Sequence, residues 1–539
     1  MTSHSTVASD SIPLWLLILL AVAWILPGLI GHEPWKPDEA YSFGLVYHIL
    51  QTGDWVVPTL AGEPFMEKPP LFYITAALFA QALSPWLPLH DGARLTAGFY
   101  MAFTLLFTGL AARELSGHGR TAVLALLACL GLAPWAHLLI TDTALLAGLA
   151  LGLYGFALGL RRPIIGGLCL GTGVGIAFLS KGLLGPGLLG LTALVLPALH
   201  RTWRTRTYFI SLGVAVTASL PWLLVWPIAL YLRSPELFGV WLWDNNFGRF
   251  LGTSGLGPKS ERFFYLRTLP WFAWPVWLLA LWGLWRIGRD GLQQPSVRLP
   301  LTALAVMLLA LMGASDARQV YALPLLLPLA LLSARAIDFL SGRTEIMFYA
   351  LGVTVTLIAL LLPWGIWISL IQEVALFTAL DPPSTPPPVF SWSTAIAILL
   401  SLGGLFTLYA LRQQRERAVA TWAIAATLFS GLVMTLLLDT IDGQKSYRDT
   451  MISLKNALPA AYDCVVSEGL EEPQRAMVEY YAGVQTLRRA VQPNAKCQLM
   501  LRQEWVVEPP AHDLRQWRVL WVGQRPGDTK EKFRLYQRL

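Results

Sequence analysis

The sequence predicts an α-helical polytopic membrane protein with a small α/β domain at its C-terminus. Of its 539 residues, 55% are apolar and only 14% are charged, and the mean hydropathy is +0.53. Apolar stretches recur along the first 440 residues, many of them near the 20 residues or so that a helix needs to cross a bilayer. The composition then changes, and the last 95 residues or so resemble an ordinary soluble protein.

Thirteen apolar segments are candidate membrane spans. They are centred on residues 13–30, 93–112, 121–138, 144–160, 164–180, 183–199, 208–228, 270–287, 299–313, 321–335, 346–370, 392–411 and 418–438. Several contain Pro or Gly, which membrane helices tolerate where neighbouring groups satisfy the freed backbone. The first segment lacks a basic leading region and a small-residue cleavage site, so we expect it to be retained as a helix.

The distribution of Lys and Arg predicts a cytoplasmic N-terminus. Connections on the cytoplasmic side of a membrane are enriched in these residues, and the short connections after every second span carry most of them. The opposite connections are longer and mix acids, bases and aromatic residues. We therefore expect the C-terminus and any chemistry outside the cytoplasm. The net charge of +7 follows largely from this pattern and gives no support for nucleic-acid binding.

The first outer connection is expected to form two short helices on the membrane surface. Pro37, Asp38 and Glu39 are typical of a helix start, because carboxylates favour the positive N-terminal end. Apolar residues then recur at helical spacing until Gly53, which can end the helix. A second apolar helix is expected from Leu71 to Leu83. Both are too short to span a bilayer.

The C-terminal composition predicts a separate domain. We expect a transmembrane domain over residues 1–440 and a soluble domain over residues 441–539, with helices over 446–458 and 476–490 and strands over 463–467, 497–502, 518–522 and 532–536. If this domain is exported, Cys464 and Cys497 can form a disulfide. Two unpaired thiols in a cytosolic domain are the alternative.

Three carboxylates on the outer side are candidate catalytic residues: Asp38, Glu39 and Asp142. The simplest interpretation of each is a helix cap. A cap needs one acid, however, and here two adjacent acids lie in the same connection as Lys68. Carboxylates on one membrane face can divide acid–base and positioning roles between them.

Four cations lie near helix ends on the same side and are candidates for binding an anion: Lys68, Lys181, Arg249 and Arg318. Each could simply extend its charge to the membrane interface. Four outer connections that each supply one cation would, however, suit a phosphate group.

A divalent metal is a further candidate ligand. Glu67 and Asp244 offer carboxylate oxygens, and Asn245 and Asn246 adjoin Asp244. Oxygen ligands of this kind suit hard divalent cations. No H-x-x-H or E-x-x-H spacing supports such a site.

The first outer connection also resembles a known family. The motifs are P-D-E-A-Y (residues 37–41) and Q-T-G-D-W-V-V-P-T-L-A-G-E-P-F-M-E-K-P-P-L-F-Y (residues 51–73). They are similar to the signature of bacterial aminoarabinose transferases, which modify the lipid A of lipopolysaccharide. More broadly they resemble the GT-C membrane glycosyltransferases that include protein O-mannosyltransferases. The resemblance extends over nearly the whole chain and implies a GT-C fold with about 13 spans and an exported C-terminal domain.

This resemblance implies roles for particular residues. Asp38 and Asp142 match two acidic positions needed for transfer. The groups that receive the polyprenyl phosphate are matched by Lys68, Arg249 and Tyr321.

Two further matches concern the third and fourth outer connections. Lys181 falls in a matching S-K-G sequence. Glu67 matches a metal-ligand position whose partner in relatives is a His of the fourth outer connection. Here that stretch reads W-D-N-N-F-G-R-F and contains no His, which leaves Asp244 as the candidate substitute.

The expected function is transfer of a sugar from a polyprenyl (undecaprenyl) phosphate at the outer face of the bacterial inner membrane, by a single displacement. No nucleotide cofactor is expected, because the sequence has no Gly-rich nucleotide motif. The acceptor is lipid A, another glycan or a protein, and a monomer is expected. A transporter of polyprenyl-linked glycolipids is the alternative, although transporters usually show internal repeats. A receptor or scaffold is the third hypothesis. The sequence leaves the sugar and the acceptor open.

Overall fold

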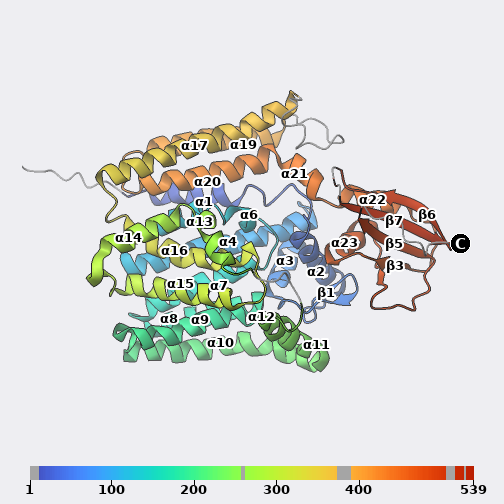
Figure 1. Ribbon diagram of the computed structural model, residues 1–539, viewed down its shortest axis with the longest axis horizontal. Helices are drawn as coiled ribbons and strands as arrows, with labels where there is room; N and C mark the ends of the chain where they lie inside the picture. The colour runs from blue at the N-terminus through green and yellow to red at the C-terminus, as the bar shows by residue number, and fades with distance from the viewer. Residues whose placement is uncertain (1–10, 256–260, 373–389, 506–515, 527, 529) are drawn as a thin grey trace, which may run out of the picture.

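The computed structural model describes residues 11–255, 261–372, 390–505, 516–526, 528 and 530–539. A bundle of long helices forms most of the molecule, and the C-terminal strands form a sheet beyond one end of it (Figure 1). Helices α2 (Asp38–Thr52) and α3 (Leu71–Leu83) and strand β1 (Thr59–Leu60) lie between the bundle and this sheet. The first outer connection therefore contacts both parts.

Nine helices within the described ranges are long and apolar enough to cross a membrane. They are α4 (Leu89–Ser116), α7 (Asp142–Gly159), α8 (Pro163–Lys181), α10 (Arg206–Arg233), α15 (Pro295–Gly313), α16 (Leu323–Ala336) with the preceding turn η3 (Gln319–Ala322), α17 (Gly342–Ile371), α19 (Trp392–Ala410) and α20 (Arg417–Leu436). The other four predicted segments also contain helix, but α1 (Leu14–Ile25) and α9 (Leu184–Leu199) are shorter, and two segments are broken. The number thirteen thus stays a prediction.

The two broken segments face each other. One consists of α5 (Gly119–Ala128) and α6 (Ala133–Ala136), the other of α13 (Phe264–Phe272) and α14 (Val276–Gly291). At the breaks, the Leu130 N–H donates to the Trp274 carbonyl at 3.1 Å and the Gly131 N–H to the Phe272 carbonyl at 2.7 Å. Pro275, which lacks an N–H, follows directly. At the breaks, the two segments thereby pair backbone groups with each other that would be paired within a continuous helix.

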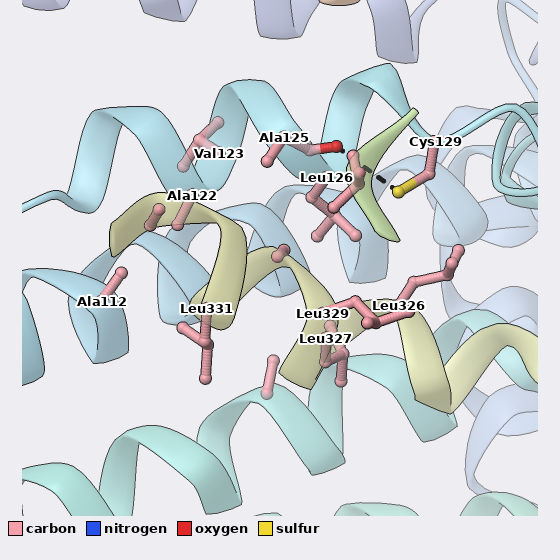
Figure 2. Packing of buried hydrophobic residues seen from close by; sticks show 14 of the residues in the cluster. Ala112, Ala122, Val123, Ala125, Leu126, Cys129, Leu326, Leu327, Leu329 and Leu331 are labelled. Carbon is pink, nitrogen blue, oxygen red and sulfur yellow. Dashed lines mark hydrogen bonds between the residues drawn. The ribbon is translucent and has the colours of Figure 1, made fainter. Parts of the chain in front are cut away.

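Leucine and alanine side chains of α4, α5 and α16 fill the centre of the bundle (Figure 2). Leu126, Leu326 and Leu327 are fully buried there. The Cys129 thiol donates to the Ala125 carbonyl at 3.4 Å, so this cysteine packs within the core. Close packing of this kind is a main source of helix association where lipid replaces water.

Glycines bring α7 and α8 into close contact. A Cβ at Gly155 would lie 2.5 Å from the backbone nitrogen of Leu170, and a Cβ at Gly166 would lie 2.4 Å from the backbone of Gly159. Small residues allow membrane helices to approach this closely. Because α7 begins at Asp142 and α8 ends at Lys181, the antiparallel pair brings these two side chains to the same end of the bundle.

Both helices predicted in the first outer connection are present. Helix α2 starts at Asp38 and is followed by Gly53, whose φ of 68° gives the left-handed ending. The second helix covers the predicted residues. Between them, β1 pairs with β2 (Glu63–Pro64) in a short antiparallel hairpin.

The C-terminal residues form a mixed five-stranded sheet in the order β4-β3-β5-β7-β6. Its elements, with their neighbouring helices, are α21 (Leu438–Lys445), α22 (Arg448–Ala457), β3 (Val465–Glu468), α23 (Glu472–Met477), η4 (Val478–Ala482), β4 (Leu487–Arg488), β5 (Leu499–Trp505), β6 (Trp517–Gly523) and β7 (Glu531–Arg538). Strand β3 runs parallel to β4 and β5, and the other pairs are antiparallel. Cys464 and Cys497 form a disulfide.

Two features of this region differ from the sequence analysis. The helix predicted over 476–490 instead runs from Glu472 to Ala482. Gly483 ends it with a φ of 72°, and Leu487 and Arg488 then form an edge strand. Helix α21 crosses the predicted boundary between residues 440 and 441. The division into two domains stays a prediction.

The C-terminal region is fastened to the first outer connection by buried polar contacts. Arg475 donates to the Ala61 carbonyl at 3.1 Å and pairs with Glu63 at 3.1 Å. The Tyr481 hydroxyl donates to Glu33 at 2.5 Å. Glu33 precedes α2 in the sequence, and Ala61 and Glu63 follow it. The C-terminal region therefore holds the segments at both ends of this helix.

We expect Gly155→Val to destabilise the protein by roughly 1–3 kcal/mol, because the added side chain would push α8 away from α7. The measurement is the thermal unfolding midpoint in detergent. Gly213→Ala on α10 is the matched control, since a Cβ there meets nothing within 4 Å. Equal midpoints for Gly155→Val and wild type would contradict the packing described for α7 and α8.

Candidate active site

A cavity of about 310 Å³ opens where α8 ends, α9 begins and α15 ends. Its polar lining consists mainly of Glu67, Lys68, Lys181, Arg249, Asp316 and Tyr321. Its apolar lining includes Leu184, Leu188 and Leu191 of α9, Phe247 of η2 (Val240–Gly248), Phe250 of α12 (Arg249–Leu251), and Ala310 and Leu311 of α15. The cavity therefore suits an amphiphile with an anionic head group.

Arg249 is held on both edges of its guanidinium. Its Nε donates to Asp316 Oδ2 at 3.0 Å, and its Nη2 lies 3.0 Å from the same oxygen. On the other edge, Nη1 lies 2.9 Å from Glu67. The Tyr321 hydroxyl is 3.4 Å from both Arg249 and Asp316. Asp316 thus orients two of the predicted phosphate-binding groups.

Lys68 is buried beside Tyr41 and Glu67. Its Nζ donates to the Tyr41 hydroxyl at 2.8 Å and lies 3.5 Å from the Glu67 carboxylate. Burial alone would raise the pKa of Glu67, but Lys68 and Arg249 outweigh it and lower that pKa to about 2. Glu67 is therefore ionised throughout the physiological range.

Lys181 and Asp142 form a buried ion pair. The Lys181 ammonium also lies 4.3 Å from the centre of the Tyr321 ring, a cation–π distance. Together these two contacts connect the start of α7, the end of α8 and the turn η3. Lys181 also lines the cavity beside Lys68 and Arg249.

Asp38, at the start of α2, has no hydrogen-bond or ion-pair partner for its carboxylate within the described part of the chain. Burial raises the pKa of this carboxyl above its usual value; Lys68 opposes the shift and Asp142 adds to it. The carboxylate therefore lies near both residues while remaining available to bind or deprotonate another molecule.

Glu39, the neighbouring candidate, is placed differently. It is 1% exposed, does not line the cavity, and accepts hydrogen bonds from Arg94 Nε at 2.8 Å and the Leu139 N–H at 2.9 Å. Arg94 also pairs with Asp91 at 2.7 Å. Because Leu139 lies just before Asp142, Glu39 links the start of α2 to the start of α7.

All three predicted catalytic carboxylates, Asp38, Glu39 and Asp142, lie outside the cavity lining, and so do two of the other predicted residues. Arg318 has a side chain that is 40% exposed and lies 3.9 Å from Asp316. Asp244 is exposed on η2. Its neighbour Asn246 does line the cavity, and its side-chain oxygen accepts from the Leu183 N–H at 3.0 Å. The fourth connection is thereby fixed to the S-K-G turn.

The donor set does not fit the proposed metal. Glu67 is bound by Arg249 and lies next to Lys68, so a cation at its carboxylate would face two positive charges. Within the described ranges, no three His, Cys, Asp or Glu side chains form a group that could hold a metal ion. Glu67 is instead an ion-pair partner of Arg249 and Lys68.

Two residues that contact the predicted phosphate-binding groups were given no role from the sequence. Asp316 lies in the same connection as Arg318 and Tyr321, and an acid two residues before a candidate anion-binding Arg was the available signal. Tyr41 lies three residues after Asp38, which places both on one face of α2. Neither position gives a signal as clear as paired acids or a basic helix end.

No family model matches the chain, but named relatives and solved structures do. The undecaprenyl phosphate-alpha-4-amino-4-deoxy-L-arabinose arabinosyl transferase of Serratia proteamaculans is 26% identical over 435 residues, which cover 78% of this chain and 75% of that protein. The protein of the same name from Pseudomonas aeruginosa is 30% identical over 344 residues, or 60% of this chain and 59% of the relative.

A solved structure extends the likeness to the whole fold. The crystal structure of ArnT from Cupriavidus metallidurans bound to undecaprenyl phosphate matches with a TM-score of 0.72 and 16% identity, covering 97% of each chain. Both sequence relatives are named as arabinosyl transferases, and the solved structure has the same fold as this chain. Along most of its length, the chain is thus similar in sequence to aminoarabinose transferases, and it is similar in fold to ArnT.

Proposed function

We propose that the protein transfers a sugar from undecaprenyl phosphate, or a related polyprenyl phosphate, to an acceptor outside the cytoplasm. The observation that carries this proposal is the cavity, in which Lys68, Lys181, Arg249 and Tyr321 meet at one end of an apolar wall. A phosphate fits the cationic end, and a polyprenyl chain fits the surfaces of α9 and α15.

The reaction is a single displacement at the anomeric carbon. As the acceptor oxygen bonds to that carbon, the bond to the phosphate oxygen breaks, and the polyprenyl phosphate leaves with an added negative charge. Lys68 and Arg249 stabilise this charge in a site with limited access to water. The configuration at the anomeric carbon inverts.

Asp38 serves the acceptor in this mechanism. If the acceptor is a phosphate, the group is already nucleophilic and Asp38 orients it. If the acceptor is a hydroxyl, the Asp38 carboxylate takes its proton as general base. The Lys181–Asp142 pair holds Lys181 at the cavity. Glu39 is a positioning residue, because its contacts with Arg94 and Leu139 fix the segments that carry Asp38 and Asp142.

The names of the relatives suggest the substrates. We propose 4-amino-4-deoxy-L-arabinose as the first sugar to test and lipid A as the first acceptor. The proposed location is the bacterial inner membrane, with the N-terminus cytoplasmic and the cavity and C-terminal region periplasmic. Thirteen spans would meet that topology, because an odd number places the termini on opposite sides.

We expect purified wild-type protein to convert polyprenyl-phosphate sugars and a bacterial lipid extract into sugar-bearing products and free polyprenyl phosphate. Asp38→Asn should slow this transfer by about 10²–10⁴-fold, the usual contribution of a positioned acid or base. Mass spectrometry of the products is the measurement, and the mass shift identifies the acceptor.

Glu236→Gln is the control for this experiment, since Glu236 is an exposed acid of α11 (Pro235–Gly239) away from the cavity lining. Full transfer by Asp38→Asn would remove Asp38 from the mechanism. Movement of intact donor across a reconstituted bilayer, with no sugar transferred, would indicate a transporter instead.

The pH dependence of kcat/KM provides a separate prediction. The Asp38 carboxylate acts when ionised, so activity should be present above its pKa and lost as pH falls through it. Burial raises this pKa above its usual value, and Lys68 opposes the shift. Lys68→Met should therefore move the acid limb to higher pH as well as weaken donor binding. An acid limb that stays in place in this variant would contradict the assignment to Asp38.

A further inference from the structure

The two carboxylates that flank Arg249 differ in how firmly they are held. Asp316 spans the Nε and Nη2 edge, and its side chain is 6% exposed. Glu67 contacts the Nη1 edge at 2.9 Å, and its side chain is 25% exposed. The more exposed carboxylate is the one that can be displaced with least rearrangement.

Glu67 occupies the cations that the proposed mechanism assigns to phosphate. Its carboxylate lies 2.9 Å from Arg249 and 3.5 Å from Lys68, and all three side chains line the cavity. A phosphate oxygen that binds both cations must take the place of this carboxylate. Donor and Glu67 therefore compete for the same two groups.

The competition matters most for the product. A polyprenyl phosphate monoester carries about 1.5 to 2 negative charges, as a phosphomonoester does near neutral pH, whereas the sugar-bearing diester carries one. The cations that favour departure of the phosphate in the reaction therefore also retain it afterwards. Product release limits the turnover of many enzymes, and an ionised group that reclaims the cations would accelerate it.

We propose that Glu67 is an exchangeable counter-ion of the phosphate site: its carboxylate neutralises Arg249 and Lys68 in the free protein, yields them to the donor phosphate, and returns to release the polyprenyl phosphate. This inference rests on the proposed function. It gives Glu67 a role in turnover that needs no metal.

The test is the binding of farnesyl phosphate, a short polyprenyl phosphate, to purified protein in detergent. Glu67→Gln keeps the size of the side chain and removes its charge, so the dissociation constant should fall by about 5- to 150-fold, the usual range of coupling between two sites. Glu67→Asp retains the charge and should bind closer to wild type. Glu236→Gln removes an exposed charge away from the cavity lining and should leave binding unchanged.

Transfer kinetics provide the second measurement. Glu67→Gln should keep a wild-type rate in a single turnover and lose rate in multiple turnovers, with stronger inhibition by added farnesyl phosphate. Both measurements are made with and without EDTA. Unchanged or weaker binding by a folded Glu67→Gln protein would overturn the inference, as would an affinity that depends on metal in wild type and not in the variant.

The two proposals can fail separately. If wild type transfers sugar and Glu67→Gln binds farnesyl phosphate no more tightly, the counter-ion role is wrong and the transferase stands. If wild type neither binds farnesyl phosphate nor transfers sugar, the counter-ion role falls together with the proposed function.

Discussion

Pairing of buried charges at one end of the helix bundle is the constraint on which the site depends. A charge removed from water is costly unless another charge or several hydrogen bonds compensate it. Here Lys181 pairs with Asp142, and Arg249 with Asp316 and Glu67. Each partner comes from a different segment. The electrostatic requirement therefore also determines how the outer connections fold against one another.

The same requirement explains why Asp38, the proposed reacting carboxylate, differs from Glu39. Arg94 fully engages Glu39, whereas Asp38 lies one residue earlier and keeps its carboxylate free of partners among the described residues. Removal of one partner from a buried pair typically costs 3–5 kcal/mol. The two adjacent acids thus have different surroundings: Glu39 is held by Arg94 and the Leu139 N–H, which suits the proposed positioning role, and the free carboxylate of Asp38 suits the proposed catalytic role. The C-terminal region reinforces this arrangement through Arg475 and Tyr481.

Local patterns in the sequence predicted the parts of the fold that depend on nearby residues. The start of α2 at Asp38 and its end at Gly53 follow from helix capping, and the position of α3 follows from its apolar length. The breaks near Gly131 and Pro275 were not predicted, because each is stabilised by hydrogen bonds to the other, more than 100 residues away. The edge strand at Leu487 was missed for a similar reason, since it forms by pairing with β3.

For the candidate site, the sequence indicated which cations take part but not how the charged side chains pair. Charge type and membrane side identified Lys68, Lys181 and Arg249, which all line the cavity. Sequence alone could not show which carboxylate faces which cation. Asp316 was given no role because its importance lies in contacts with Arg249 and Tyr321. Glu67 was assigned to a metal because it matches a metal-ligand position of the family that the sequence resembles, whereas here its carboxylate contacts Arg249 and lies beside Lys68.

A crystal structure of the protein with bound undecaprenyl phosphate would test the proposed phosphate site most directly. We expect the phosphate between Lys68, Arg249 and Tyr321, the Glu67 carboxylate turned away from Arg249, and the polyprenyl chain against α9 and α15. A phosphate bound elsewhere, with the contact between Arg249 and Glu67 intact, would contradict it.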